Sequence, residues 1–180
     1  MDYKTKPISR LDLRKIAYWF RSLFKTRNKY RFDAVGAFEK IHSIFPQITV
    51  EVVENDYLPE NVPARCVPDF NGNYHIEVKD SVYVGACDGI GGYRNHIVHE
   101  LSHAVLCLLG FTPILERSFN DNEIPNRSES MEWQAKALCG EIMIPYEETR
   151  GLSKKKIISY CQVSEASAEM RLKLDKNISE

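Results

Sequence analysis

Residues 93–109 read YRNHIVHELSHAVLCLL and are followed by Gly110. Apolar side chains recur in this stretch every three or four positions and cover most of a helical circumference, which predicts a long, buried α-helix. Gly110 stands where a left-handed residue commonly ends a helix. His99 and His103 are four residues apart, so a helix places both imidazoles on one face, about one turn from each other. Glu100 lies beside that face.

The residues His-Glu-Leu-Ser-His at positions 99–103 predict a zinc site. Two imidazoles one helical turn apart match two ligands of a tetrahedral zinc ion. Zinc lowers the pKa of a water that it holds, and Glu100 can take a proton from that water as it attacks a carbonyl carbon. The competing interpretation is two core histidines with ordinary hydrogen bonds. Burial of two imidazoles and a carboxylate without partners would be costly in an apolar helix, which favours the metal.

A catalytic zinc site takes a third ligand from the protein, and the sequence offers two candidates. The extended pattern H-E-x-x-H-x-x-G-x-x-H is excluded, because positions 106 and 109 are both Leu. Another helix is expected at residues 128–143, with Ser128 as its cap. Glu132 lies on the apolar face of that helix, so its carboxylate is expected to point inward. Glu129, one turn earlier, is the competitor.

Several further polar residues have roles that the sequence leaves open. His96 lies one turn before His99 and is a candidate to support the ligands. Cys107 could face the metal, although an inert buried thiol is the commoner case. The unranked candidates for stabilising an oxyanion are Tyr93, Arg94 and Tyr146. The histidines expected to be unrelated to the site are His42 and His75.

Two blocks of the sequence resemble the ImmA/IrrE family of metallopeptidases. The first block is IVHELSHA at residues 97–104, and the second is EWQAKALCGEIMIP at residues 132–145. The closing helices of the family are similar to residues 157–172, and the resemblance as a whole extends over residues 92–174. The chain departs from the family pattern at four positions, namely Lys136, Leu138, Cys139 and Ile144.

This resemblance implies a gluzincin-like site with His99, His103 and Glu132 as zinc ligands and Glu100 as catalytic acid and base. Members of the family cleave transcriptional repressors that contain helix-turn-helix domains, which relieves repression of mobile elements or stress genes. The implied function is a site-specific zinc endopeptidase that acts on such a repressor. The four departures concern packing around the site, so they bear on substrate and fine geometry more than on zinc binding.

The expected fold is α+β, with a zincin-like core in which a small sheet packs on the His-Glu helix. Other helices are expected at residues 9–25 (capped by Ser9), 33–45, 153–160 and 164–175. Strands are expected at 48–53, at 65–70 and 74–79 as a hairpin, and at 81–84, before a glycine-rich loop at 89–92. The expected segments of one compact domain are a basic helical segment (1–46), a metallopeptidase core (47–150) and a C-terminal helical pair (151–180).

Charges are unevenly distributed along the chain. The net charge is −1, but residues 1–31 contain ten Lys and Arg against two acids. The basic face expected on the first helix consists of Arg14, Lys15, Arg21 and Lys25. Such an arm is a candidate for direct contact with nucleic acid or an acidic partner, although a solvated helix face is the commoner case.

The expected location is the cytoplasm. The first residues lead into no apolar segment of a signal peptide, and no run of 18 or more apolar residues offers a membrane span. Five cysteines without a CxxC pair argue against a disulfide framework and fit a reducing compartment. The sequence does not decide the oligomeric state.

Two other functions stay open from the sequence. A non-cleaving regulatory module could keep the scaffold and bind a repressor or DNA, since the C-terminal pair resembles a helix-turn-helix. Only residues 154–156 supply clustered lysines there, however. The presence of Glu100 argues against this module, because binding alone needs no general base. A zinc hydrolase of a non-peptide amide is chemically allowed, but the family resemblance does not favour it.

Overall fold

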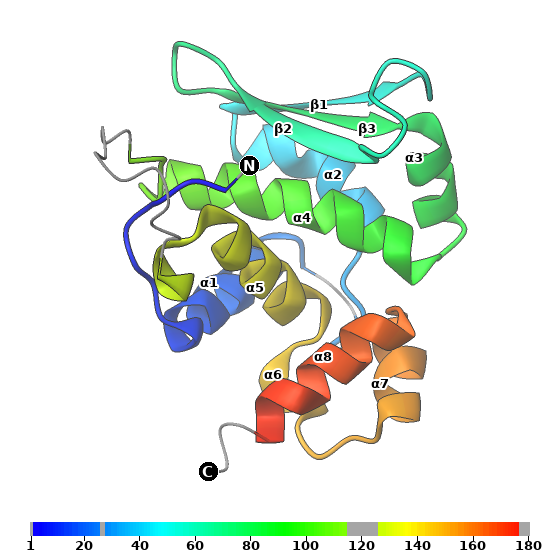
Figure 1. Cartoon of the computed structure of the whole chain (residues 1–180). Helices are drawn as coiled ribbons and strands as arrows, with labels where there is room; N and C mark the ends of the chain where they lie inside the picture. Colours follow the sequence, from blue (N-terminus) through cyan, green and yellow to red (C-terminus); the bar gives the residue numbers. More distant parts are fainter. Residues whose placement is uncertain (1, 26–27, 115–125, 177–180) are drawn as a thin grey trace.

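The computed structural model describes residues 2–25, 28–114 and 126–176, which form an α+β fold of eight α-helices and one three-stranded sheet. In chain order the elements are α1 (Arg10–Leu23), α2 (Ala34–Ile44), β1 (Ile48–Val53), β2 (Ala64–Pro68), β3 (Tyr74–Lys79), α3 (Asp80–Cys87), α4 (Gly91–Leu108), the 3-10 turn η1 (Arg127–Glu129), α5 (Met131–Met143), α6 (Tyr146–Thr149), α7 (Lys154–Cys161) and α8 (Glu165–Lys176). The sheet covers one side of α4, and α1 and α5 lie on the other side (Figure 1). The expected α+β class is confirmed.

The sheet has the strand order β1-β3-β2, so the last strand in the sequence is the central one. β3 pairs in parallel with β1, from Ile48 opposite Tyr74 to Val53 opposite Lys79. The predicted hairpin is the antiparallel pair of β2 and β3, although β2 ends at Pro68, earlier than expected. β2 is therefore an edge strand, and it contacts α4.

The prediction of a strand at residues 81–84 is wrong, because this segment belongs to helix α3. Val82 and Ala86 are buried, whereas Val84 is 48% exposed. A strand would place Val82 and Val84 on the same face, but a helix places Val82 beside Ala86. The local preference of β-branched residues for strands is weaker here than the gain from burying Val82 and Ala86 together.

The start of α4 lies close to the C-terminal helices. α4 begins at Gly91, so two of the glycines expected in a loop belong to its first turn. A Cβ atom on Gly91 would lie 2.7 Å from the backbone of residues 163–164, and glycine therefore permits this close approach. The buried guanidinium of Arg94 also links α4 to other segments. It donates to the carbonyl oxygen of Gln162, between α7 and α8, and to that of Phe32, just before α2.

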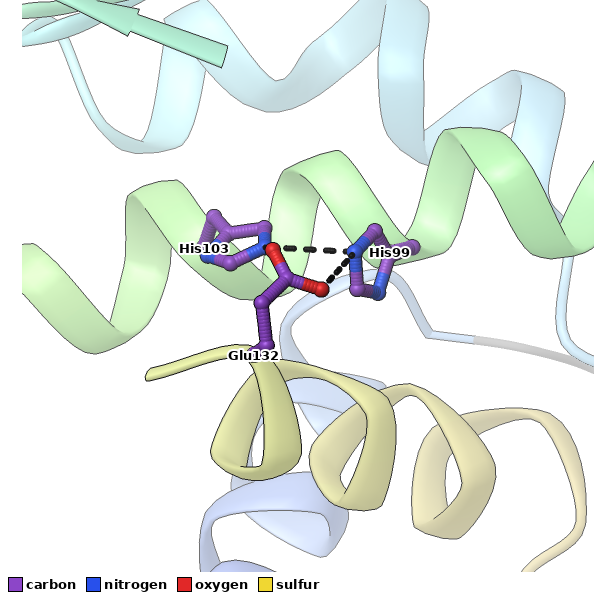
Figure 2. A group of neighbouring side chains, drawn as sticks. All are labelled: His99, His103 and Glu132. Carbon is purple, nitrogen blue, oxygen red and sulfur yellow. Dashed lines mark hydrogen bonds and ion pairs between the residues drawn. The ribbon is translucent and has the colours of Figure 1, made fainter. Parts of the chain in front are cut away.

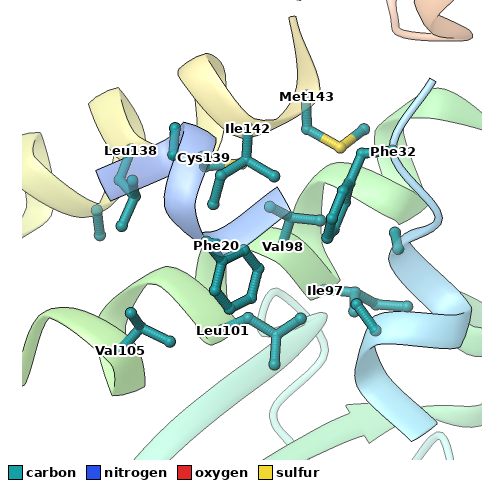
Figure 3. Packing of buried hydrophobic residues seen from close by; sticks show 14 of the residues in the cluster. Phe20, Phe32, Ile97, Val98, Leu101, Val105, Leu138, Cys139, Ile142 and Met143 are labelled. Carbon is teal, nitrogen blue, oxygen red and sulfur yellow. The ribbon is translucent and has the colours of Figure 1, made fainter. Parts of the chain in front are cut away.

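α4 is buried between other elements, which explains why apolar residues cover most of its circumference. Figure 3 shows side chains of α1, α4 and α5 meeting in one cluster, in which Phe20, Leu101 and Ile142 are at most 1% exposed. Full burial of such a side chain contributes about 1.5–3 kcal/mol. The cluster extends to Ile76 in the sheet and Ala168 in α8, so the three segments expected from the sequence share one core.

The prediction of a basic face on α1 is wrong at Arg14 and Arg21, and Lys25 lies beyond the end of the helix at Leu23. Arg14 pairs with the buried carboxylate of Glu141 at 3.1 Å, and Arg21 donates to the carbonyl oxygen of Ile142 at 2.5 Å. Lys15 is exposed, as expected. The two guanidiniums therefore join α1 to α5. Their acceptors, the carboxylate of Glu141 and the carbonyl oxygen of Ile142, belong to α5 and could not be inferred from the sequence of α1.

The C-terminal helical pair is present as expected. α7 ends at Cys161, and Gln162 takes a left-handed conformation with a φ of 53° before α8 begins. Lys154 pairs with Glu165 at 2.6 Å and with Glu169 at 3.0 Å, which joins the two helices. In the part of the chain that the structure describes, no helix combines the length and the apolar character that a membrane span needs.

Candidate metal centre

Two helices that are far apart in the sequence bring three side chains together. His99 and His103 extend from successive turns of α4, and Glu132 reaches them from the first turn of α5 (Figure 2). His103 Nε2 is 3.2 Å from His99 Nε2 and 3.1 Å from Glu132 Oε1. His99 Nε2 is 3.7 Å from Glu132 Oε2. Among the described residues, these three form the group that could hold a metal ion.

The spacing of the three side chains fits a tetrahedral ion. With ligand bonds of about 2.0–2.2 Å, neighbouring ligand atoms of tetrahedral zinc are about 3.3–3.6 Å apart. The separations in this group range from 3.1 to 3.7 Å. Two unprotonated imidazole nitrogens at 3.2 Å would repel each other unless a proton or a cation lay between them. Two imidazoles and one carboxylate are also a ligand set that catalytic zinc uses.

The ionisation of Glu132 and His99 suits a cation. The hydrogen bond with His103 lowers the pKa of Glu132 to about 2, so the carboxylate is charged. Burial, followed by the charge of neighbouring His103, lowers the pKa of His99 to about 4. His99 is therefore neutral near pH 7. A charged carboxylate and a neutral imidazole are the forms that bind a metal.

Glu100 lies beside the group, on the part of α4 that β2 approaches. Burial raises the pKa of Glu100 to about 7, against the opposing charge of His103. The backbone of Cys66 in that strand lies close to this carboxylate and favours its charged form, which acts to lower its pKa. A carboxyl group with a pKa near neutrality can accept and donate a proton, as general acid–base catalysis requires.

The start of α5 sets the position of Glu132. Ser128, the expected cap, lies in η1 instead, and Ser130 is the cap, because its hydroxyl accepts the N–H of Trp133 at 3.0 Å. The prediction was wrong by two residues because backbone pairing with the N-terminal segment keeps this stretch out of the helix. Glu129 also lies in η1 and is outside the candidate ligand group of the described chain.

An N-terminal segment that the sequence did not connect with the site supports this cap. Residues 3–8 form backbone hydrogen bonds with residues 128–131. Asp2 Oδ1 accepts the N–H of Glu132 at 3.1 Å, and its other carboxylate oxygen accepts the hydroxyl hydrogen of Ser130. No sequence pattern signals this contact, because Asp2 and Glu132 are 130 positions apart.

Comparison with known proteins adds no assignment to this geometry. Neither a family model nor a curated protein matches the chain. The function is therefore inferred from the side chains that α4 and α5 bring together. The resemblance of residues 97–104 and 132–145 to a peptidase family stays a prediction.

Other residues considered from the sequence have contacts of their own. The ring of Tyr146 contacts two guanidiniums, since its centre lies 3.6 Å from Cζ of Arg14 in α1 and 4.5 Å from Cζ of Arg171 in α8. Cys107 Sγ is 3.8 Å from the carbonyl oxygen of Phe111. Arg94 donates to the carbonyl oxygens of Phe32 and Gln162, and the ring of Tyr93 lies against Gly85. The histidines outside the candidate ligand group are His42, His75 and His96.

Proposed function

We propose that this chain is a zinc-dependent endopeptidase with a zincin-like core of the gluzincin type. One observation supports the proposal above all, namely that Glu132 Oε1 lies 3.1 Å from His103 Nε2 on the His-Glu-x-x-His helix. In this proposal His99, His103 and Glu132 hold the ion, and Glu100 is the catalytic acid and base. When bound, zinc would supply a Lewis acid that polarises a peptide carbonyl and lowers the pKa of water.

Glu100 transfers the protons in this proposal. As water adds to the carbonyl carbon of a peptide bond, Glu100 takes one of its protons and later delivers it to the leaving nitrogen. The C–N bond breaks, and a carboxyl group and an amine are formed. The backbone of Cys66 lies close to the carboxylate of Glu100, so β2 borders the proposed general base.

The proposed substrate is a transcriptional repressor with a helix-turn-helix domain, and the proposed location is the cytoplasm. Support comes from the sequence blocks at 97–104 and 132–145 and from the closing helices, which resemble the ImmA/IrrE family. Cleavage of such a repressor would relieve repression of mobile-element or stress genes.

Metal content and cleavage, measured on matched variants, test the proposal. The parent protein and Glu129→Ala are expected to hold about one zinc per chain, and Glu132→Ala is expected to lose it. Glu100→Gln is expected to keep the zinc but no longer cleave a co-expressed helix-turn-helix repressor. A parent protein that binds no metal after incubation with zinc would overturn the proposal.

The alternative function is a non-cleaving module that binds a repressor or DNA on the same scaffold. It predicts that Glu100→Gln leaves the regulatory effect unchanged. The contacts of the described residues disfavour DNA binding by α1, because Arg14 and Arg21 bond with α5. In the C-terminal pair, Lys154 bonds with two glutamates of α8.

A further inference from the structure

A cavity of about 360 Å³ adjoins the candidate ligand group. It lies between α4, α5 and α8, and His99 forms part of its wall, so a peptide at the ligand group could extend into it. Much of the wall is apolar, with Ala137 and Met143 from α5 and Met170 and Leu174 from α8. Its volume lies within the range of natural ligand pockets, roughly 300–1,000 Å³.

Cations border this cavity, and none of its described lining residues is an Asp or a Glu. Lys136, whose side chain is 69% exposed, forms an ion pair with Glu132 of the ligand group, with Nζ 3.4 Å from Oε2. The guanidinium of Arg127 lies 5.5 Å from the ring centre of Trp133, and both residues line the cavity. Arg10 lines it as well.

The carboxylate that pairs with Arg10 is hidden from the cavity. Glu141 has a fully buried side chain, and its Oε1 is 2.8 Å from Arg10 Nε. Arg10 belongs to the cavity wall, but Glu141 does not. The positive side of this ion pair is therefore the side that faces the cavity.

We propose that this cavity is a specificity site for a glutamate side chain of the substrate, next to the bond that is cleaved. The inference rests on the proposed peptidase function, since it takes the ligand group beside His99 as the place of cleavage. The two methylene groups of a glutamate can contact the apolar wall, and its carboxylate can pair with Lys136 or Arg127. Glutamine would keep the apolar contacts without the ion pair, and lysine would meet like charges.

A binding experiment tests this proposal without cleavage. The zinc-loaded Glu100→Gln variant also carries Trp19→Phe, so that Trp133 is the remaining tryptophan and its fluorescence reports on the cavity. The probes are acetyl-Ala-Ala-Glu-Ala-Ala-amide and the same peptide with Gln or Lys at its centre. The Glu peptide is expected to bind about 5-fold more tightly than the Gln peptide, the effect of one partly exposed ion pair. Equal affinities would overturn the proposal.

Charge-reversal variants test which cations produce the preference for the Glu peptide. Arg127→Glu and Lys136→Glu are each expected to abolish the preference for the Glu peptide. Lys155→Glu reverses an exposed charge on α7 and is the matched control, which is expected to keep the preference. Zinc content is measured in every variant, because Lys136 contacts the proposed ligand Glu132. A preference that survives both reversals would overturn the proposal.

A cleavage experiment separates this inference from the proposed function. The zinc-loaded parent protein is incubated with a mixture of randomised decapeptides, and the products are sequenced. Enrichment of Glu over Gln beside the cleaved bonds supports both proposals. Cleavage without that enrichment keeps the peptidase and overturns the specificity site. Glu-selective binding without any cleavage keeps the site for acidic peptides and overturns the peptidase.

Discussion

The two histidines and Glu132 form one candidate site, but the chain positions them in different ways. His99 and His103 are placed by one helix, because a spacing of four residues is enough to bring two imidazoles to one face. Glu132 lies in the first turn of α5, which is held by hydrogen bonds with Asp2, 130 positions away, and with the backbone of the N-terminal segment. One half of the site is therefore local in origin, whereas the other half depends on tertiary contacts.

Loss of a ligand from α4 is expected to have the largest effect. His103→Ala should reduce bound zinc from about one ion per chain to almost none, since two protein ligands do not make a stable site. Elemental analysis after dialysis measures this change. His42→Ala is the control and should keep the zinc, because His42 bonds with the carbonyl oxygen of Ile48 instead. Full zinc content in His103→Ala would place the ion elsewhere.

The next largest effect is expected from the buried acid of α5. Glu141 has a fully buried side chain and pairs with Arg10, Arg14 and Arg171. Glu141→Gln should lower the free energy of unfolding by about 3–5 kcal/mol, because the buried guanidinium of Arg171 and the partly buried ones of Arg10 and Arg14 lose their anionic partner. Urea denaturation measures this loss. Glu165→Gln, at a 68% exposed side chain, is the control and should cost about 0–1 kcal/mol. Similar losses in both would contradict a joining role for Glu141.

A smaller effect is expected from Asp2, which tests the dependence of Glu132 on a distant contact. Asp2→Ala should weaken zinc binding by about 10-fold, since outer partners that orient a ligand have effects of this order. Competition with a chelating dye measures the affinity. Asp12→Ala removes a comparable exposed acid from the first turn of α1 and should leave zinc affinity unchanged. Unchanged affinity in Asp2→Ala would mean that α5 positions Glu132 without the N-terminal segment.

The smallest effect is expected at the two serines before α5. Ser130→Ala should lower the free energy of unfolding by about 1 kcal/mol, because the hydroxyl that caps the helix is lost. Ser128→Ala lies outside the cap and should change stability far less. The thermal unfolding of the two variants shows which of the two serines caps α5. Equal losses would return Ser128 to the role of cap that the sequence predicted.

Prediction from sequence succeeded where neighbouring residues decide the structure. Ser9 caps α1, and the mostly β-branched residues 48–53 form β1, as predicted. It failed at residues 81–84, where the β-branched residues were given more weight than the helical spacing of Val82 and Ala86, which are buried together in α3. It also failed at Arg14, which faces α5 because Glu141 lies there. That distant partner leaves no trace in the local pattern of α1.

By itself, the sequence determined that one helix brings His99 and His103 to the same face with Glu100 beside it. The reason is that an α-helix repeats every 3.6 residues whatever packs against it. Only the tertiary structure decided that Glu132 joins the two histidines while Glu129 stays outside the candidate group. The distance between two helices depends on the side chains that fill the space between them and on the contacts that end each helix. Those contacts come here from Asp2, far away in the sequence.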